Sequence, residues 1–163
     1  MILFFHGLDS SAQTNKFEVI NNRVTLGKVS ETVDYRNMSH DEVSEFYDDL
    51  IAKHSPDLIV GHSLGGYWAI KKSNEHGIPC VLINPSLSPN VFADYPAIDK
   101  SSLDLDIPRG FHIELGDEVL DMVEVAHFAE DIGAITYIYE HGCHRVKYLQ
   151  EINNVIEHIQ AYR

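Results

Sequence analysis

The feature that most constrains the fold is a serine flanked by glycines, at the point where an apolar run gives way to a helical pattern. Leu58-Ile59-Val60 is typical of a buried strand, and Gly61-His62-Ser63-Leu64-Gly65 follows it directly. A sharp turn of this kind strains the backbone of its central residue, and a Cβ at Gly61 or Gly65 would collide with a neighbouring element. The pattern predicts a nucleophile elbow that holds Ser63 Oγ out of the sheet. The alternative is a tight glycine-rich turn around a serine with no chemical role.

Apolar runs alternate with helical patterns along the rest of the chain. Strands are expected at residues 2–5, 58–60, 80–83, 111–116 and 134–139, with one more between Val24 and Tyr35, and helices at residues 14–21, 39–54, 64–76 and 122–132 and from about residue 148 onward. For the strand between Val24 and Tyr35, residues 24–26 and residues 31–33 are both candidates. The alternation predicts an α/β fold, with a mainly parallel sheet of about six strands and helices on both faces.

Length and charge limit the classes of protein to which the chain can belong. Residues 1–163 suit a single domain that buries a full core without disulfides or metals. The formal net charge of −13 argues against binding nucleic acid or an anionic membrane through a basic face. No apolar run approaches the length of a membrane span, and residues 1–5 lack the cationic leader of a signal peptide. Cys80 and Cys143 are expected at opposite edges of the sheet and reduced, as in a cytoplasmic protein.

Three residues that follow predicted strands have the side chains of a catalytic triad. Asp117 comes directly after the strand that ends at Gly116, and His144 comes just after the last strand. Because the carboxyl ends of parallel strands meet at one edge of a sheet, we expect Ser63, Asp117 and His144 to lie close together. A histidine base activates a serine hydroxyl, and a carboxylate orients that histidine. The order of the three along the chain is the order that accompanies a nucleophile elbow.

Two other acidic residues compete with Asp117 for the role of the triad acid. Glu118 is adjacent to it but would face the other way if the stretch stays extended. Asp121, with Glu124 three residues later, is typical of a helix cap. Asp117 is therefore the predicted acid.

Other residues near His144 offer alternatives for the base. His141 could take the role if the loop runs differently. Glu140, His141 and His144 could also form half of a zinc site, but no motif supplies the remaining ligands, so no metal is expected. Cys143 is expected to be a bystander because nothing places it on an elbow.

Two backbone amides are candidates for an oxyanion hole. The N–H of Leu64 begins the helix after the elbow, where free N–H groups and the helix dipole favour negative charge. The N–H of Leu8 lies in His6-Gly7-Leu8, where the glycine permits a close approach to Ser63. The alternative for that loop is a plain connection between a strand and a helix.

Five segments together carry a family resemblance. They are FHGLDSS at residues 5–11, GHSLGGY at 61–67, INP at 83–85, GDEVLD at 116–121 and GCH at 142–144. The chain resembles, along nearly its whole length, the small bacterial esterases of the YqiA type in the α/β-hydrolase superfamily. The resemblance implies an α/β-hydrolase sheet that lacks the first two strands of larger members, and carboxylester hydrolysis through Ser63, Asp117 and His144. The chain departs from that family in its shorter length, its compressed residues 84–110 and Arg145-Val146 after the histidine.

We therefore expect a serine esterase that cleaves small acyl esters through an acyl-enzyme on Ser63. His144 would act first as base and then as acid, Asp117 would orient it, and the reaction needs no cofactor. The expected partner is a small-molecule acyl ester. A thioesterase or an acyltransferase would use the same triad, and a non-catalytic α/β-hydrolase-like binding domain is the alternative from another class.

Residues 84–110 form a proline-interrupted connection that is expected to hold at most one brief helix and no large lid domain. Its apolar residues, expected to wall a pocket beside Ser63, are Val91, Phe92, Tyr95 and Ile98. A short wall favours acyl groups of about two to six carbons, because each buried methylene contributes about 0.8 kcal/mol only while the wall lasts. The acidic surface is expected to disfavour anionic substrates such as acyl-CoA.

Overall fold

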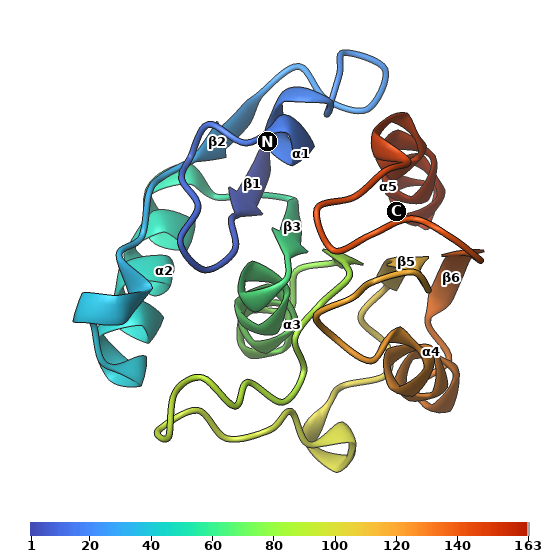
Figure 1. The fold of residues 1–163 in the computed structure, drawn as a ribbon. Helices are drawn as coiled ribbons and strands as arrows, with labels where there is room; N and C mark the ends of the chain where they lie inside the picture. Colours follow the sequence, from blue (N-terminus) through green and yellow to red (C-terminus); the bar gives the residue numbers. More distant parts are fainter. Residues whose placement is uncertain (163) are drawn as a thin grey trace.

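The computed structural model describes residues 1–162 and contains a six-stranded sheet with helices on both faces (Figure 1). All neighbouring strands pair in parallel, in the order β2-β1-β3-β4-β5-β6. This architecture is the α/β fold that the alternating pattern predicts. The strands are β1 (Ile2–Phe5), β2 (Lys28–Ser30), β3 (Leu58–His62), β4 (Cys80–Ile83), β5 (Arg109–Glu114) and β6 (Ile135–Tyr139).

Within residues 1–162, five α-helices cover the two faces of the sheet (Figure 1). α2, α3 and α4 pack into an apolar cluster on one face, and α1 and α5 pack into a second cluster on the other. The helices are α1 (Asn15–Glu18), α2 (His40–His54), α3 (Leu64–His76), α4 (Met122–Asp131) and α5 (Ile152–Gln160), with short 3-10 turns η1 (Tyr35–Asn37), η2 (Lys100–Ser102) and η3 (Leu149–Glu151).

The central strands bury every side chain because helices cover both faces of the sheet. β1, β3, β4 and β5 are buried along their whole length, whereas the edge strands β2 and β6 are half-buried or exposed. The continuous apolar runs of β1 and β4 predict this burial correctly, and both strands have the predicted bounds.

β5 differs from its prediction. It begins at Arg109 rather than Phe111, and it is a fully buried strand paired on both sides instead of one near the edge of the buried region. The alternation in its sequence comes from polar side chains that find partners inside the protein. Arg109, for example, donates to the carbonyl oxygen of Asp104 (2.8 Å) and to Asn74 Oδ1 (3.1 Å).

The second strand lies between its two predicted candidates. Neither residues 24–26 nor residues 31–33 form it, because β2 pairs with β1 through Lys28, Val29 and Ser30. Val24 and Val33 are both buried, but in clusters on opposite faces of the sheet. Backbone hydrogen bonding to β1, rather than side-chain burial, decides the position of this edge strand.

Local signals set the start of α2 and the end of α3, the two longest helices. Ser39 and Glu42 form the predicted capping box of α2, in which each side chain accepts a hydrogen bond from the other residue's backbone N–H. α3 covers Leu64–His76 as predicted, and it ends at Gly77, whose φ of 70° suits glycine.

The first helix is shorter than the predicted residues 14–21. Thr14 caps α1 by accepting a hydrogen bond from Phe17 N (3.1 Å), but the helix stops short of residue 21. Lys28 Nζ donates to the carbonyl oxygens of Phe17 (2.8 Å) and Ile20 (2.7 Å). A tertiary contact thus takes carbonyl groups that a longer helix would use internally.

The connection from β4 to β5 carries no helical lid, and η2 is its only regular element. The sheet edge at the carboxyl ends of the strands is therefore not covered by an inserted domain. None of the helices among residues 1–162 has the length and apolarity needed to cross a bilayer.

Candidate active site

Ser63 lies in a strained turn between β3 and α3. Its φ of 56° and ψ of −119° are unusual for a residue with a side chain. A Cβ at Gly61 would overlap the backbone of Gly65, and a Cβ at Gly65 would overlap the carbonyl oxygen of Phe5. The two glycines are therefore required for the turn, as expected of a nucleophile elbow.

Ser63, His144 and Asp117 form a chain of hydrogen bonds at the carboxyl edge of the sheet. Ser63 Oγ lies 3.0 Å from His144 Nε2, and His144 Nδ1 lies 2.7 Å from Asp117 Oδ2. The three residues follow β3, β6 and β5, respectively. The structure thus brings together the three side chains that were predicted to meet, in an arrangement that can pass a proton from the serine to an oriented imidazole.

The Asp117 carboxylate is held from three further directions. Oδ1 accepts hydrogen bonds from the backbone N–H groups of Val119 and Leu120, both at 2.8 Å. Oδ2 also accepts a hydrogen bond from Asn84 Nδ2 at 3.0 Å. Asn84 is buried at the end of β4, where its φ is 39°. These contacts fix the carboxylate that faces His144.

Of the competing acids, Glu118 does not behave as predicted. Its Oε2 accepts a hydrogen bond from His144 N at 3.1 Å, so it does not face away from the site. The reason is that the chain turns at Asp117, whose N–H bonds to the carbonyl of Glu114, and does not stay extended. Asp121 caps α4 as predicted, accepting from the N–H groups of the residues two and three positions later.

The loop that carries His144 is clamped by Glu114, which the sequence analysis missed. Glu114 Oε1 accepts hydrogen bonds from the backbone N–H groups of Cys143 (3.2 Å) and Lys147 (2.8 Å), on either side of His144. Oε2 accepts from His112 Nε2 at 2.7 Å. Burial raises the pKa of Glu114, but these hydrogen bonds outweigh it and hold the pKa below its usual value. In the sequence, the only indication of this role is the position of an acidic residue inside an otherwise buried strand.

His62, the residue before the serine, is a second support that the sequence analysis missed. Its Nε2 lies 2.7 Å from the carbonyl oxygen of His144. Burial, helped by the nearby charge of Lys16, lowers the pKa of His62 to about 3. The ring is therefore neutral near pH 7, and Nε2–H donates to the loop that carries His144.

The two candidate oxyanion donors lie at the same cavity as Ser63. The N–H of Leu64 is at the first residue of α3 and has no acceptor within the helix. Gly7 packs against the serine, since a Cβ there would lie 3.3 Å from Ser63 Cβ. His6 Nδ1 lies 2.7 Å from the carbonyl oxygen of Gly7, while Nε2 accepts from Val33 N. In a trans peptide the N–H points opposite to the C=O, so this bond directs the N–H of Leu8 away from the His6 ring.

The cavity at Ser63 has a volume of about 650 Å³. Of the four residues predicted to wall it, only Val91 does so. Phe92 and Tyr95 pack against each other with ring centroids 5.2 Å apart, and Tyr95 OH accepts a hydrogen bond from Trp68 Nε1. The tertiary packing of these rings removes them from the cavity. The apolar residues that line it are Leu8, Leu64, Pro89, Val91, Val119 and Leu120.

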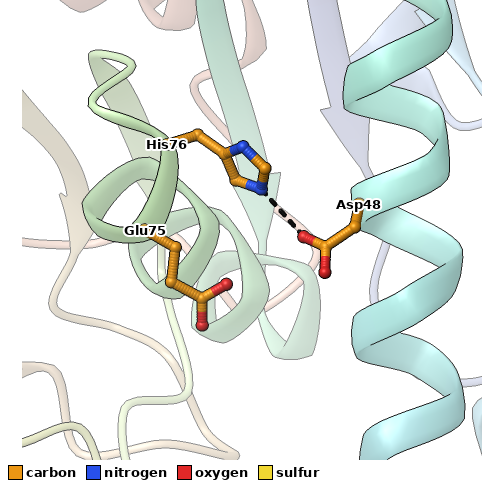
Figure 2. A group of neighbouring side chains, drawn as sticks. All are labelled: Asp48, Glu75 and His76. Carbon is orange, nitrogen blue, oxygen red and sulfur yellow. Dashed lines mark hydrogen bonds and ion pairs between the residues drawn. The ribbon is translucent and has the colours of Figure 1, made fainter.

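Asp48, Glu75 and His76 form the one group among residues 1–162 whose ligand atoms lie close enough to hold a metal ion (Figure 2). Lys72, which is fully buried, already places Nζ 2.8 Å from Asp48 Oδ1 and 2.7 Å from Glu75 Oε2. His76 Nε2 also lies 2.8 Å from Asp48 Oδ1. The group is therefore an ion-pair cluster that joins α2 to α3, with an ammonium among the carboxylates.

The parallel sheet and the strained serine turn after β3 are features of an α/β-hydrolase fold, which within residues 1–162 has no lid. The chain is similar to the ydeN gene product from B. subtilis, with a TM-score of 0.76 and 14% identity, over 98% of both chains. It is also similar to the Paleococcus ferrophilus monoacylglycerol lipase, with a TM-score of 0.73 and 12% identity, over 99% of this chain and 94% of that one. At such low identity these similarities show the fold alone.

The sequence itself identifies the family. Residues 1–103 match "Uncharacterised protein family (UPF0227)", and the chain belongs to this family. A UPF0227 protein from Shewanella woodyi is 34% identical over 96 residues, which are 55% of this chain and 52% of that relative. The chain thus spans about half the length of the curated relatives it matches. The matched residues include Ser63 and the His6-Gly7 loop but end before Asp117 and His144, so the sequence match is narrower than the resemblance expected along nearly the whole chain.

Proposed function

We propose that this chain is a serine esterase that hydrolyses small carboxylic esters. One observation carries the proposal: Ser63 Oγ, in a strained elbow, lies 3.0 Å from His144 Nε2, whose other ring nitrogen lies 2.7 Å from Asp117 Oδ2. A serine hydroxyl in this setting can lose its proton to the imidazole as it attacks a carbonyl. The resemblance to the YqiA-type esterases supports the same reaction.

The proposed reaction has two halves. Ser63 Oγ attacks the carbonyl carbon of the ester while His144 Nε2 takes the hydroxyl proton, and the carbonyl oxygen becomes an oxyanion. The N–H groups of Leu8 and Leu64 donate to that oxyanion. The C–O bond to the alcohol then breaks, and His144 gives the alcohol its proton, which leaves an acyl group on Ser63. Water attacks the acyl-enzyme with His144 as base, and the acid leaves with Ser63 restored.

Asp117 and its supports hold His144 in the tautomer that this scheme requires. With Nδ1–H donating to the carboxylate, Nε2 carries the lone pair that faces Ser63. The carboxylate also stabilises the imidazolium that forms in both halves of the reaction. No step requires a cofactor.

The open, lidless cavity supports a proposal for the substrate class. Its apolar wall is short, and residues 92, 95 and 98 do not extend it. We therefore propose that kcat/KM is highest for acyl groups of about two to six carbons, beyond which further methylenes, each worth about 0.8 kcal/mol when buried, gain no contact. A maximum at long-chain or CoA esters would instead indicate a thioesterase with the same triad.

Covalent labelling tests the reaction directly. A fluorophosphonate should add to Ser63 Oγ with loss of fluoride, and mass spectrometry of the digested protein should locate the adduct on the Ser63 peptide. Ser63→Ala should abolish both labelling and hydrolysis of 4-nitrophenyl butyrate. Ser86→Ala is the matched control, because Ser86 lines the same cavity but has no histidine partner among the described residues. Labelling that survives Ser63→Ala, or no labelling at all, would exclude the proposal.

A further inference from the structure

The cavity beside Ser63 has a different charge balance from the chain as a whole. The chain carries a formal net charge of −13, yet the charged side chains that line the cavity include Lys16 and Arg145. Among residues 1–162, Asp9 is the only carboxylate that lines it. Arg36 already binds both oxygens of that carboxylate, with Nε–Oδ1 and Nη2–Oδ2 distances of 2.6 and 2.7 Å. The cavity is therefore locally cationic.

Lys16 is a largely buried lysine that lines the cavity, and its ammonium has no counter-ion among the described residues. The residue is 9% exposed and lies on α1, and Nζ has no hydrogen bond or ion pair with any residue in the described part of the chain. Lys72, the other buried lysine, pairs with Asp48 and Glu75 and donates to Ser44 Oγ. Burying a charge is costly unless an opposite charge compensates it. Lys16, whose side chain is largely buried at the cavity, lacks the carboxylate partners that Lys72 has.

Arg145 places a second unpaired cation beside the first. It follows His144 directly, lines the same cavity, and makes no ion pair within 4 Å among residues 1–162. Burial and the charge of Arg145 both lower the pKa of Lys16, so the two cations are close enough to repel each other. An anion between them would relieve this repulsion and supply the missing partner.

We propose that Lys16 and Arg145 form an anion subsite beside Ser63, and that the preferred substrates are small esters that carry a carboxylate or phosphate near the ester group. This inference rests on the proposed esterase function. It reverses the expectation that the acidic surface disfavours anionic substrates. Beyond about 10 Å the surface charges are screened by salt, whereas Lys16 and Arg145 would contact the anion directly.

Paired esters of equal acyl length test the subsite. The first pair is 4-nitrophenyl hemiglutarate and 4-nitrophenyl pentanoate, in which the anion is on the acyl side. The second pair is 4-(pentanoyloxy)benzoate and its methyl ester, in which the anion is on the alcohol side. The measured quantity is the ratio of kcat/KM for the anionic ester to that for the neutral ester. Since every variant receives the same esters, their intrinsic reactivities cancel when the ratios are compared.

Lys16→Met and Arg145→Gln should each lower this ratio roughly tenfold or more for at least one pair, which is the loss expected when a charged hydrogen bond is removed. Lys16→Arg should retain most of the ratio because the positive charge remains. Lys53→Met is the matched control, since it removes one positive charge from an exposed site on α2 and should leave the ratio unchanged. Ratios within twofold of wild type in both Lys16→Met and Arg145→Gln, for both pairs, would overturn the proposal.

A binding measurement separates this proposal from the esterase proposal. Glutarate is titrated into Ser63→Ala protein and into Ser63→Ala protein that also carries Lys16→Met, and the affinities are compared by NMR shift changes. At least tenfold weaker binding in the double variant would support the subsite, whether or not the protein hydrolyses esters. Suppose that the two proteins bind glutarate equally, that the kcat/KM ratio is unchanged, and that neutral esters are hydrolysed through Ser63. The subsite would then be rejected, while the esterase proposal would still be supported.

Discussion

At the scale of single residues, the site depends on a serine with a strained backbone and on a glycine whose position leaves no room for a side chain. Ser63 has a φ of 56°, and such strain persists only where the surroundings enforce it. Gly65 provides part of that enforcement, because the carbonyl groups of Phe5 and His6 lie where its Cβ would be. The close approach ties the elbow to β1 and to the loop that carries the Leu8 amide.

Gly65→Ala should therefore be severely destabilising. The added methyl group meets backbone atoms, which cannot move aside as a flexible side chain can, so we expect a loss of about 3 kcal/mol or more in the free energy of unfolding. Urea denaturation measures this loss. Gly27→Ala is the control: its Cβ would lie 3.4 Å from the flexible end of Met1, and the variant should stay close to wild type. Equal stability of the two variants would contradict the close approach.

Asp117→Asn should retain the fold and lose activity. The amide has one acceptor oxygen, so it cannot accept both from His144 and Asn84, which now bind Oδ2, and from the N–H groups of Val119 and Leu120, which now bind Oδ1. An NH2 group turned toward His144 would no longer accept from Nδ1–H, and the imidazole would lose the partner that sets its tautomer. We expect kcat to fall by up to roughly 10⁴-fold, the loss reported for the equivalent change in a serine protease triad. Steady-state kinetics with 4-nitrophenyl butyrate measures the effect.

The matched control for this prediction is Asp121→Asn. It changes the cap of α4 and no contact of His144. If Asp121→Asn or Glu118→Gln abolished activity while Asp117→Asn did not, the triad acid would be wrongly assigned.

At the scale of elements, the loop between β6 and α5 has no regular structure before η3 but is tied to β5. Gly142, with φ of 88°, lies directly against Glu114, and the carboxylate of that residue accepts N–H groups from both sides of His144. The conformation of the loop is thus decided by a buried strand residue. Within the loop itself only the glycine suggests a fixed turn.

Glu114→Gln should loosen this loop. Gln keeps the shape of the side chain but replaces one acceptor oxygen with a donor, so at least one backbone N–H loses its partner. We expect a loss of about 1.5–3 kcal/mol in stability for a hydrogen bond to a charged group, and a fall in kcat of roughly 10- to 100-fold from the displaced His144. Exposed Glu140, just before the loop, offers Glu140→Gln as a control that should change neither quantity.

The hydrogen bonds of the Glu114 carboxylate to the His144 loop make folding stability depend on pH in a definite direction. The pKa of Glu114 is lowered in the folded state, so its contribution to stability is fully present above the ordinary Glu value of about 4.3. The contribution is lost as pH falls through the lowered pKa. Urea denaturation between pH 5 and pH 3 should therefore show a smaller further loss for Glu114→Gln than for wild type. A parallel loss in both proteins would contradict the clamp.

At the scale of the whole molecule, His62 makes folding sensitive to mild acid. Its pKa is about 3 in the folded state, whereas an unfolded chain has a histidine pKa of about 6.5. Between these values the unfolded chain binds a proton that the folded protein does not. The stability from neutral His62 is therefore complete above about pH 6.5 and falls by about 1.4 kcal/mol per pH unit below it.

His62→Gln should remove this part of the acid sensitivity. Gln can still donate to the carbonyl of His144 but does not titrate, so the loss in unfolding free energy between pH 7 and pH 5 should be smaller than in wild type by about 2 kcal/mol. Urea denaturation at the two pH values measures it. His141→Gln, at an exposed position, should lose as much as wild type. If His62→Gln lost as much unfolding free energy as wild type between pH 7 and pH 5, the His62 ring would not be neutral in the folded protein.

The sequence by itself determined the parts of this protein that depend on local order. The apolar runs of β1 and β4 identify strands with the correct bounds, and the capping box at Ser39 begins α2 where predicted. The glycines around Ser63 predict the elbow, because only glycine fits a turn so close to the neighbouring backbone. The meeting of Ser63, Asp117 and His144 could be predicted too, because residues after parallel strands share one edge of the sheet.

Only the tertiary structure decided what depends on register, loop direction and burial. The sequence prediction misplaces β2 because the position of an edge strand is set by its pairing with β1. Phe92 and Tyr95 do not line the cavity because they pack against each other. The hydrogen bonds of Glu114 join residues that are far apart in the chain and share no motif. That Lys16 is largely buried without a partner is likewise visible only once the chain is folded. A side chain's partners depend on which residues folding places around it, and that placement is a property of the whole packed chain rather than of any one segment.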